Sequence, residues 1–331
     1  MPKEGFDAVT LPSSMTEDIE NFVEASNKLI SSKSEALKIA WLWYKQHADS
    51  GSSSRMKLKI GNSTVGDGEP HFIIADIATN HNGEMSHIKT MIDIAAEEGC
   101  DAVKFHKKTV DAVYSRSELS SPMLSKFGKT FKEFALGVEL GKEEFDEIDD
   151  YCKKKSIMWF AECWDEQSVE FTQQYNAPCY ELPHERLNDE NLILKLKSTG
   201  KPILVRTGMM TDDAKKAVEM IGEQNAAVIH STKEFPVQLE QLYLKNITLL
   251  KRIFRCPIGH YGADVGVATS VMAATIGASI IERRITYDRT AGGPEHAASL
   301  EHNGLRILVR DIRSIPLAMG EDPRKFPYKN R

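Results

Sequence analysis

Charged side chains stand at the end of one apolar run in a way that suggests chemistry. The run "IIERRITYDR", Ile280 to Arg289, passes from apolar residues to Glu282 and then to two adjacent arginines. Arginine binds carboxylates and phosphates in bidentate fashion, so two guanidinium groups at a strand end favour an anionic partner. The pattern raises the question of why a strand end that could belong to an active site would present two cations side by side.

Other apolar runs in the chain end in polar groups of the same kinds. Carboxylates and imidazoles there, such as Asp76, Glu162 and His184, have the chemistry to move protons, and Lys104 that of a Schiff base or an acid–base group. Any one of these positions is explained as easily by a helix cap or a salt bridge, whereas a ring of them indicates a site. The positions are Asp76, Asn80, His81, Lys104, His106, Glu162, Glu181, His184, Arg206, His230, His260, Tyr261, Glu282, Arg283 and Arg284.

The elements that must position these groups are short strands alternating with helices. Eight apolar runs ("FIIADI", "DAVKF", "IMWFAE", "CYEL", "PILVR", "AAVIH", "CPIG", "ASIIE") are separated by amphipathic helical stretches. This alternation predicts a parallel sheet, and eight units in about 250 residues predict an α/β fold of the (β/α)8 TIM-barrel type, with chemistry at the carboxyl ends of the strands. An open Rossmann sheet is disfavoured, because "ATNHNGEM" after the first strand is not a Gly-x-Gly-x-x-Gly loop.

The chain divides by composition into two parts. Residues 1–55 have apolar residues at helical spacing and end in "SGSSSR", which predicts an N-terminal helical extension and a linker with no catalytic feature. Residues 56–331 form the predicted barrel domain, preceded by a short β-hairpin in "MKLKIGNSTVGDG".

Bulk composition excludes several classes of protein. The chain has 331 residues, 41% hydrophobic and 27% charged, with a net charge of −6, so neither a nucleic acid nor a membrane surface is an expected partner. No apolar run reaches about 18 residues, and no signal peptide is recognisable. Five scattered cysteines without a Cys-x-x-Cys pair predict reduced thiols in a cytoplasmic protein.

Six collinear motifs resemble the sialic acid synthase family, whose members condense phosphoenolpyruvate (PEP) with a sugar to make N-acetylneuraminate and related nonulosonates. Two of them, the opening strand with its loop and the second strand, lie in the stretch from "MKLKIGN" to "DAVKFHK", and the other four are "GKPILVRTGMMT", "IHSTKEFPV", "IGASIIERRITYDR" and "GGPEHAASLE". The resemblance runs from Met56 to about Gly320. It implies the barrel fold and an aldol-type carbon–carbon condensation in carbohydrate biosynthesis.

The resemblance also implies a site. Family members bind PEP with lysines, serines and a threonine, and hold a divalent metal, typically manganese, on two histidines at the last two strands. The chemistry of the strand-end side chains, taken together with the resemblance, makes Asp76, Lys104, Glu162, His184 and His230 the predicted catalytic residues. The predicted substrate-binding residues are Asn80, His106, Glu181, Arg206, Tyr261, Arg283, Arg284 and Glu295.

Several of these positions depart from the family pattern. Glu162, Glu181, His184 and Arg206 stand where the resemblance expects a threonine, a lysine and two serines that bind PEP. The two metal histidines are replaced by Ala263 and Arg284, and a guanidinium repels a cation. No cofactor is therefore expected. A manganese or magnesium ion is expected only if its site has moved, with His260 and Asp264 as candidate ligands.

Three hypotheses remain open from the sequence. The chain is a synthase with a relocated metal site; or a metal-independent lyase, aldolase or isomerase acting on an acidic sugar or keto acid; or a non-catalytic paralogue. The expected partners are a small anionic or sugar substrate, PEP included, and a second copy in a homodimer. The antifreeze-like domain that usually follows the family barrel is expected to be absent, with residues 1–55 replacing its dimer contact.

Overall fold

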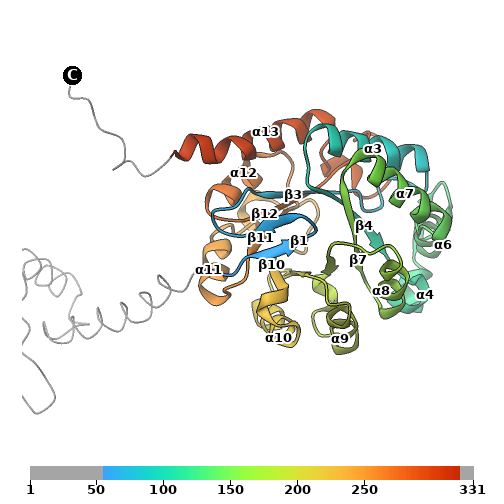
Figure 1. Cartoon of the computed structure of the whole chain (residues 1–331). Helices are drawn as coiled ribbons and strands as arrows, with labels where there is room; N and C mark the ends of the chain where they lie inside the picture. Colours follow the sequence, from blue (N-terminus) through green and yellow to red (C-terminus); the bar gives the residue numbers. More distant parts are fainter. Residues whose placement is uncertain (1–54, 321–331) are drawn as a thin grey trace, which may run out of the picture. The chain divides into compact units, whose positions relative to one another are not determined.

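The structure, a computed structural model, describes residues 55–320 (Figure 1). The helices predicted in residues 1–55 lie outside the described residues, apart from Arg55. The chain divides into two compact units, Met1–Ser54 and Arg55–Arg331.

Eight parallel strands close into a barrel, which confirms the predicted (β/α)8 fold. Each apolar run found in the sequence forms one of them, and nearly all of their residues are buried. The strands follow the chain around the barrel, and β12 pairs with β3 to close it. They are β3 (Phe72–Asp76), β4 (Ala102–Lys107), β7 (Met158–Cys163), β8 (Tyr180–Leu182), β9 (Ile203–Arg206), β10 (Ala226–His230), β11 (Ile258–Gly262) and β12 (Ile280–Arg284).

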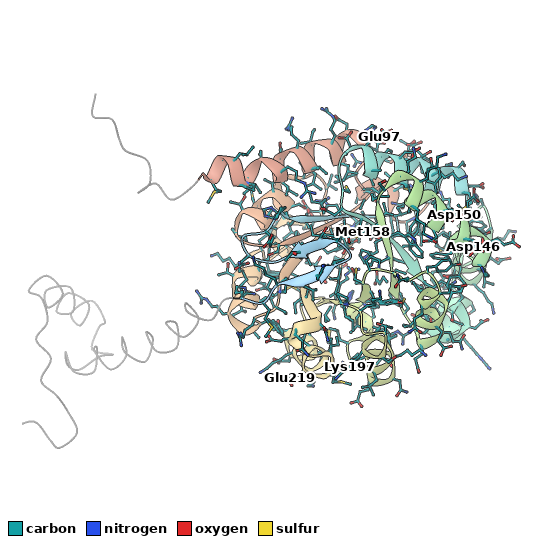
Figure 2. All side chains as sticks on the ribbon, viewed as in Figure 1. Glu97, Asp146, Asp150, Met158, Lys197 and Glu219 are labelled. Atoms are coloured by element: carbon teal, nitrogen blue, oxygen red, sulfur yellow. The ribbon has the colours of Figure 1, made fainter. Side chains whose placement is uncertain are left out.

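Helices surround the barrel (Figure 1). They are α3 (Met85–Glu97), α7 (Lys142–Lys155), α8 (Glu166–Gln173), α9 (Glu190–Ser198), α10 (Thr211–Ile221), α11 (Lys245–Ile253), α12 (Ala268–Thr275) and α13 (His302–Met319). Their buried faces carry the apolar residues that pack on the strands. The exposed side chains of Glu97, Asp146, Asp150, Lys197 and Glu219 lie on these helices (Figure 2).

The hairpin predicted before the barrel is present. Strands β1 (Leu58–Ile60) and β2 (Ser63–Val65) pair antiparallel. Leu58, Ile60 and Val65 are buried within the main hydrophobic cluster, so the hairpin is part of the barrel's core.

An insertion between β4 and α7 was not predicted. It contains α4 (Val110–Val113), α5 (Arg116–Leu119), the antiparallel pair β5 (Pro122–Ser125) and β6 (Gly128–Thr130), and α6 (Phe131–Gly137). Capping boxes start two of its short helices, Ser115 with Glu118 and Thr130 with Glu133. It has a small apolar cluster of its own, which includes Val110 and Phe131.

The pairing register determines which strand-end side chains face the same side of the sheet. Asp76 is paired with Lys104 on one side and with Arg284 on the other, so these three side chains share one face. Arg283, one residue earlier on β12, points to the opposite face, because successive residues of a strand alternate. The two adjacent arginines therefore lie on different sides of the barrel wall.

All five cysteines are buried and unpaired. Desolvation raises the pKa of each thiol above its ordinary value, to about 12 for Cys163 and Cys256. Within residues 55–320, no helix is long and apolar enough to cross a membrane.

Candidate active site at the carboxyl ends of the strands

Lys104 lies at the centre of a fully buried ionic cluster. Its Nζ donates to Glu181 Oε1 at 2.8 Å, to Glu162 Oε2 at 3.3 Å and to Glu282 Oε1, and it lies 3.8 Å from Asp76 Oδ2. The four carboxylates come from β8, β7, β12 and β3, so the barrel wall converges on one ammonium group.

The carboxylates keep this lysine charged. Burial alone lowers the pKa of Lys104, but the surrounding carboxylates, Asp76 and Glu181 first, raise it well above its ordinary value. Burial and the neighbouring Glu282 raise the pKa of Glu181, which favours a proton on that carboxyl group. A Schiff base needs a neutral amine, so the cluster opposes the Schiff-base role considered for Lys104.

Arg206 joins the cluster from β9. Its Nη1 lies 3.6 Å from Glu162 Oε2 and its Nε 3.8 Å from Glu181 Oε1. The guanidinium carbon lies 4.1 Å from the ring centroid of Tyr261, so a cation–π contact holds its plane.

Arg284 lies on the other side of the cluster and is clamped by two carboxylates. Nε and Nη2 donate to Asp76 Oδ2 at 3.2 and 3.1 Å, and Nη1 donates to Glu295 Oε1. The guanidinium carbon is 4.8 Å from the ring centroid of Phe235 and 5.8 Å from that of Tyr261. Two ion pairs and two rings therefore fix its orientation.

His106 links the two halves of the cluster. Its Nε2 lies 3.0 Å from Glu162 Oε2 and 3.5 Å from Asp76 Oδ1. Burial lowers the pKa of His106, but the two carboxylates outweigh that effect and raise it above its ordinary value. The imidazole is therefore biased toward its charged form.

A cavity of about 250 Å³ opens in front of these groups. Eight buried polar atoms of the cluster and its rim have no hydrogen-bond partner within the described part of the chain: Asp76 Oδ1, His106 Nε2, Glu162 Oε1, Trp164 Nε1, Glu181 Oε2, His184 Nδ1, Arg206 Nε and Glu282 Oε2. Five of the residues concerned line the cavity itself: His106, Glu162, Trp164, His184 and Arg206. Because a buried polar atom without a partner is costly, their concentration here indicates a place for a polar ligand or water.

Most of the predicted site residues come together at this cavity or directly behind it. His106, Glu162, His184, Arg206, Tyr261, Arg284 and Glu295 line it, and Asp76, Lys104 and Glu181 lie in the ionic cluster. Asn80 is buried to one side, where its Nδ2 donates to Ile285 O at 2.8 Å and to Ser299 Oγ at 2.9 Å. Its amide braces the backbone after β12.

Four predicted residues lie away from both this cavity and the ionic cluster: His230, His260, Asp264 and Arg283. Arg283 donates to Asp264 O at 2.6 Å and to Ser270 Oγ at 3.0 Å, on the helix side of the barrel wall. His230 contacts Leu242 O at 2.8 Å and stacks on His260, with ring centroids 5.7 Å apart. Strand alternation explains this placement, because His230, His260 and Arg283 share the outward parity.

The sequence interpretation missed an aromatic and basic wall of the cavity. Lys108, Tyr114, Phe131 and Phe134 come from the insertion after β4, and Trp164 follows β7. Lys108 Nζ lies 3.8 Å from the Trp164 ring centroid and donates to Tyr114 Oη at 2.8 Å. Trp164 could have been predicted from the sequence, because it lies two residues after Glu162 at the end of the same apolar run. The wall from the insertion has no comparable signal.

The residues present do not fit a divalent metal ion. No group of three or more His, Cys, Asp or Glu residues between Arg55 and Gly320 is arranged to hold one. Asp264, one candidate ligand, pairs with Arg283, and the Arg284 guanidinium lies between the carboxylates of Asp76 and Glu295. Ala263 offers only a methyl group.

Comparisons with known proteins give a consistent result. The model of the NeuB family matches residues 91–324. Human N-acetylneuraminate-9-phosphate synthase is 34% identical over 268 residues, which cover 79% of this chain and 75% of that protein. The N,N'-diacetyllegionaminic acid synthase of Campylobacter jejuni is 28% identical over 262 residues, covering 76% of this chain and 78% of that protein.

Solved structures agree on the fold. An N-acetylneuraminic acid synthetase from Leptospira borgpetersenii, in complex with citrate, superimposes with a TM-score of 0.74 at 23% identity, covering 83% of this chain and 93% of that one. The spore coat polysaccharide biosynthesis protein SpsE from Bacillus subtilis gives 0.70 at 26% identity, covering 80% of this chain and 73% of that one.

Proposed function

The chain belongs to the NeuB family, and from that premise we propose that it makes or breaks a carbon–carbon bond between a 2-oxo acid unit and a sugar aldehyde. The substrate class is that of nonulosonic acids. The family relationship supports synthase-like chemistry, and the cavity at the strand ends supports an acidic substrate, because Arg206 and Arg284 both line it.

One observation carries the proposal: Glu162, Trp164 and Arg206, which line a single cavity, each have a buried polar atom without a hydrogen-bond partner in the described part of the chain. Leaving such an atom without a partner costs about 1–3 kcal/mol. A barrel that had lost its ligand would be under no requirement to retain these groups, and apolar replacements would remove the cost. This favours an active enzyme over a non-catalytic paralogue.

The reaction needs a base, an acid and a cationic clamp. In the condensing direction a base removes a proton from the methyl carbon of the 2-oxo acid. The resulting enolate carbon then attacks the aldehyde carbon, and the new alkoxide takes a proton from an acid; cleavage is the reverse. Glu162, with Oε1 unpaired, and His184 are the proton-transfer groups that reach the cavity. Asp76 lies behind them against Arg284.

The surroundings of Lys104 bear on the identity of the three-carbon donor. The resemblance implies PEP, bound through lysines. Here the Lys104 ammonium is enclosed by four carboxylates, and like charges at short range would repel a phosphate group placed next to them. This supports a donor without phosphate, and hence the aldolase or lyase form of the reaction. PEP remains the second candidate, because the relatives are named as synthases.

The test uses three assays of the purified chain. N-acetylneuraminate alone is assayed for pyruvate release, pyruvate plus N-acetylmannosamine for condensation, and PEP plus N-acetylmannosamine for phosphate release. We expect turnover in the first two, reduced about 100-fold or more in Glu162→Gln. Glu143→Gln, an exposed site on α7, is the matched control and keeps full activity. Phosphate release would instead select the PEP route, and no turnover with any substrate pair would reject the proposal for these sugars.

A further inference from the structure

Ion pairs and aromatic contacts fix the position of the Arg284 guanidinium. Asp76 binds its Nε–Nη2 edge from β3, and Glu295 binds Nη1 from the segment after β12. Phe235 and Tyr261 lie against it. Its side chain is only 6% exposed, so this positive charge is fixed in the cavity wall.

Three of the five guanidinium N–H groups are used by these bonds. Within residues 55–320, Nε, Nη1 and Nη2 each make one hydrogen bond, which leaves two N–H groups of Nη1 and Nη2. Because Arg284 lines the cavity, these two groups are available to a ligand there. Two N–H groups on one rigid plane suit a carboxylate or a carbonyl oxygen.

The local charge also matches that of a divalent ion. Arg284 neutralises one charge on the pair Asp76 and Glu295, and His106 approaches Asp76 Oδ1 at 3.5 Å from the other side. The Arg284 guanidinium and a protonated His106 would together place two positive charges beside Asp76. A further metal ion at the same place would be repelled by both.

We propose that Arg284 is a covalently attached cation that replaces a metal ion in this pocket and binds the carboxylate or carbonyl oxygen of a 2-oxo acid. Asp76 and Glu295 are positioning residues that hold it. This inference deepens the proposed function and rests on it for the class of ligand. The chain then needs no divalent ion to bind that ligand.

The geometry predicts that two substitutions would create a metal site in place of the Arg284 cation. Gly262 pairs with Arg283, so the next residues on the two strands, Ala263 and Arg284, are neighbours at the barrel rim. Histidines at both positions would face the same space beside Asp76. Two imidazoles and a carboxylate are ligands that bind manganese and zinc.

The first experiment measures pyruvate binding by calorimetry with EDTA present. We expect the wild-type chain to bind, and Arg284→Gln to bind at least 10-fold more weakly. Arg284→Lys should fall between them, because an ammonium lacks the planar N–H pair. Arg310→Gln, an exposed arginine on α13, is the control for charge and stays at wild-type affinity. Unchanged affinity in Arg284→Gln, or no pyruvate binding by wild type, would overturn the inference.

The second experiment titrates manganese chloride and needs no turnover. We expect no binding by wild type, and one ion per chain in the double variant Ala263→His, Arg284→His. Stoichiometric manganese on the wild-type chain would overturn the inference; if the double variant fails to fold by circular dichroism, the wild-type titration and the Arg284→Gln arm still decide. Loss of pyruvate affinity in Arg284→Gln without carbon–carbon turnover would reject the proposed function and leave this inference standing.

Discussion

At the scale of single residues, the ionic cluster depends on Lys104 more than on any other group described. Its ammonium lies within 4 Å of four carboxylates, and all five side chains are buried. A buried ion pair adds little net stability relative to apolar packing, but removing one partner leaves uncompensated charge. Lys104 is therefore a group whose loss the barrel tolerates badly.

We predict that Lys104→Met lowers the free energy of unfolding by about 3–5 kcal/mol, because four carboxylates then share a cavity without their central cation. Urea denaturation at neutral pH measures this. Lys142→Met removes an exposed helical pair with Asp146 and should cost less than about 1 kcal/mol. Equal effects of the two substitutions would show that the cluster does not need its cation.

A second residue-scale prediction concerns pH. Since the folded pKa of His106 is raised, this residue stabilises the fold fully below its ordinary value of about 6.5, and that stabilisation is lost as pH rises through the folded pKa. We expect unfolding free energy, measured across pH 5–10, to fall above about 6.5 in wild type. The fall should be smaller in His106→Gln. If the unfolding free energies of the two proteins depended on pH in the same way, the raised pKa of His106 would be contradicted.

Residue types at strand ends could be predicted from the sequence, but not all of their directions. Asp76, Lys104, Glu162 and Arg206 were expected at the rim and lie in or beside the ionic cluster. Arg283 was expected there as well, yet it faces Asp264 on the outer side. One residue of register reverses a side chain, and the ends of an apolar run do not fix register.

At the scale of elements, the insertion between β4 and α7 supplies one wall of the cavity. Phe127, at the turn of the β5–β6 hairpin, packs near Phe134 of α6, with ring centroids 6.4 Å apart. Gly137 at the end of α6 leaves room for the Phe127 ring, because a Cβ there would overlap it. The hairpin therefore packs closely on α6 because residue 137 has no side chain.

We predict that Gly137→Ala displaces the hairpin without unfolding the barrel. The added methyl overlaps the Phe127 ring, and overpacking of this kind costs about 1–3 kcal/mol. Hydrogen exchange over residues 121–131 should become several-fold faster, while exchange in the barrel strands is unchanged. Gly292→Ala is the control, since a Cβ there meets nothing within 4 Å. Protection of the hairpin equal to that of wild type would contradict this account.

The strands were predictable and the insertion was not, for a physical reason. The run "AAVIH" consists almost entirely of apolar residues, which predicts a strand buried on both faces. It forms β10. The elements of the insertion are three to seven residues long and are fixed by capping boxes and by aromatic contacts between residues distant in sequence. Periodicity cannot identify segments of that length.

At the scale of the whole molecule, residues 55–320 contain a hydrophobic core to which the barrel strands and the helices around them contribute. The eight strands of the closed barrel and the helices described around them lie in this range. We therefore predict that deleting residues 1–54 leaves the midpoint of thermal unfolding, measured by circular dichroism, within a few degrees of the full chain. A large loss of stability would mean that the deleted residues complete the core.

The same deletion tests the predicted homodimer. Residues 1–55 were proposed from the sequence to supply a dimer contact, and this stays a prediction. We expect light scattering to give twice the chain mass for the full protein and a lower mass after deletion. An unchanged oligomer would reject the role of these residues in assembly.

Because all five cysteines are buried, the rate at which each one is alkylated reports how often the structure around it opens. Alkylating reagents attack the thiolate, and desolvation keeps every one of these thiols protonated at neutral pH. Cys163, Cys179 and Cys256 belong to the barrel wall or lie beside it, whereas Cys152 lies on α7. Mass spectrometry of labelled peptides over time would then report, without any engineered probe, whether the wall and its covering helix open together or in sequence.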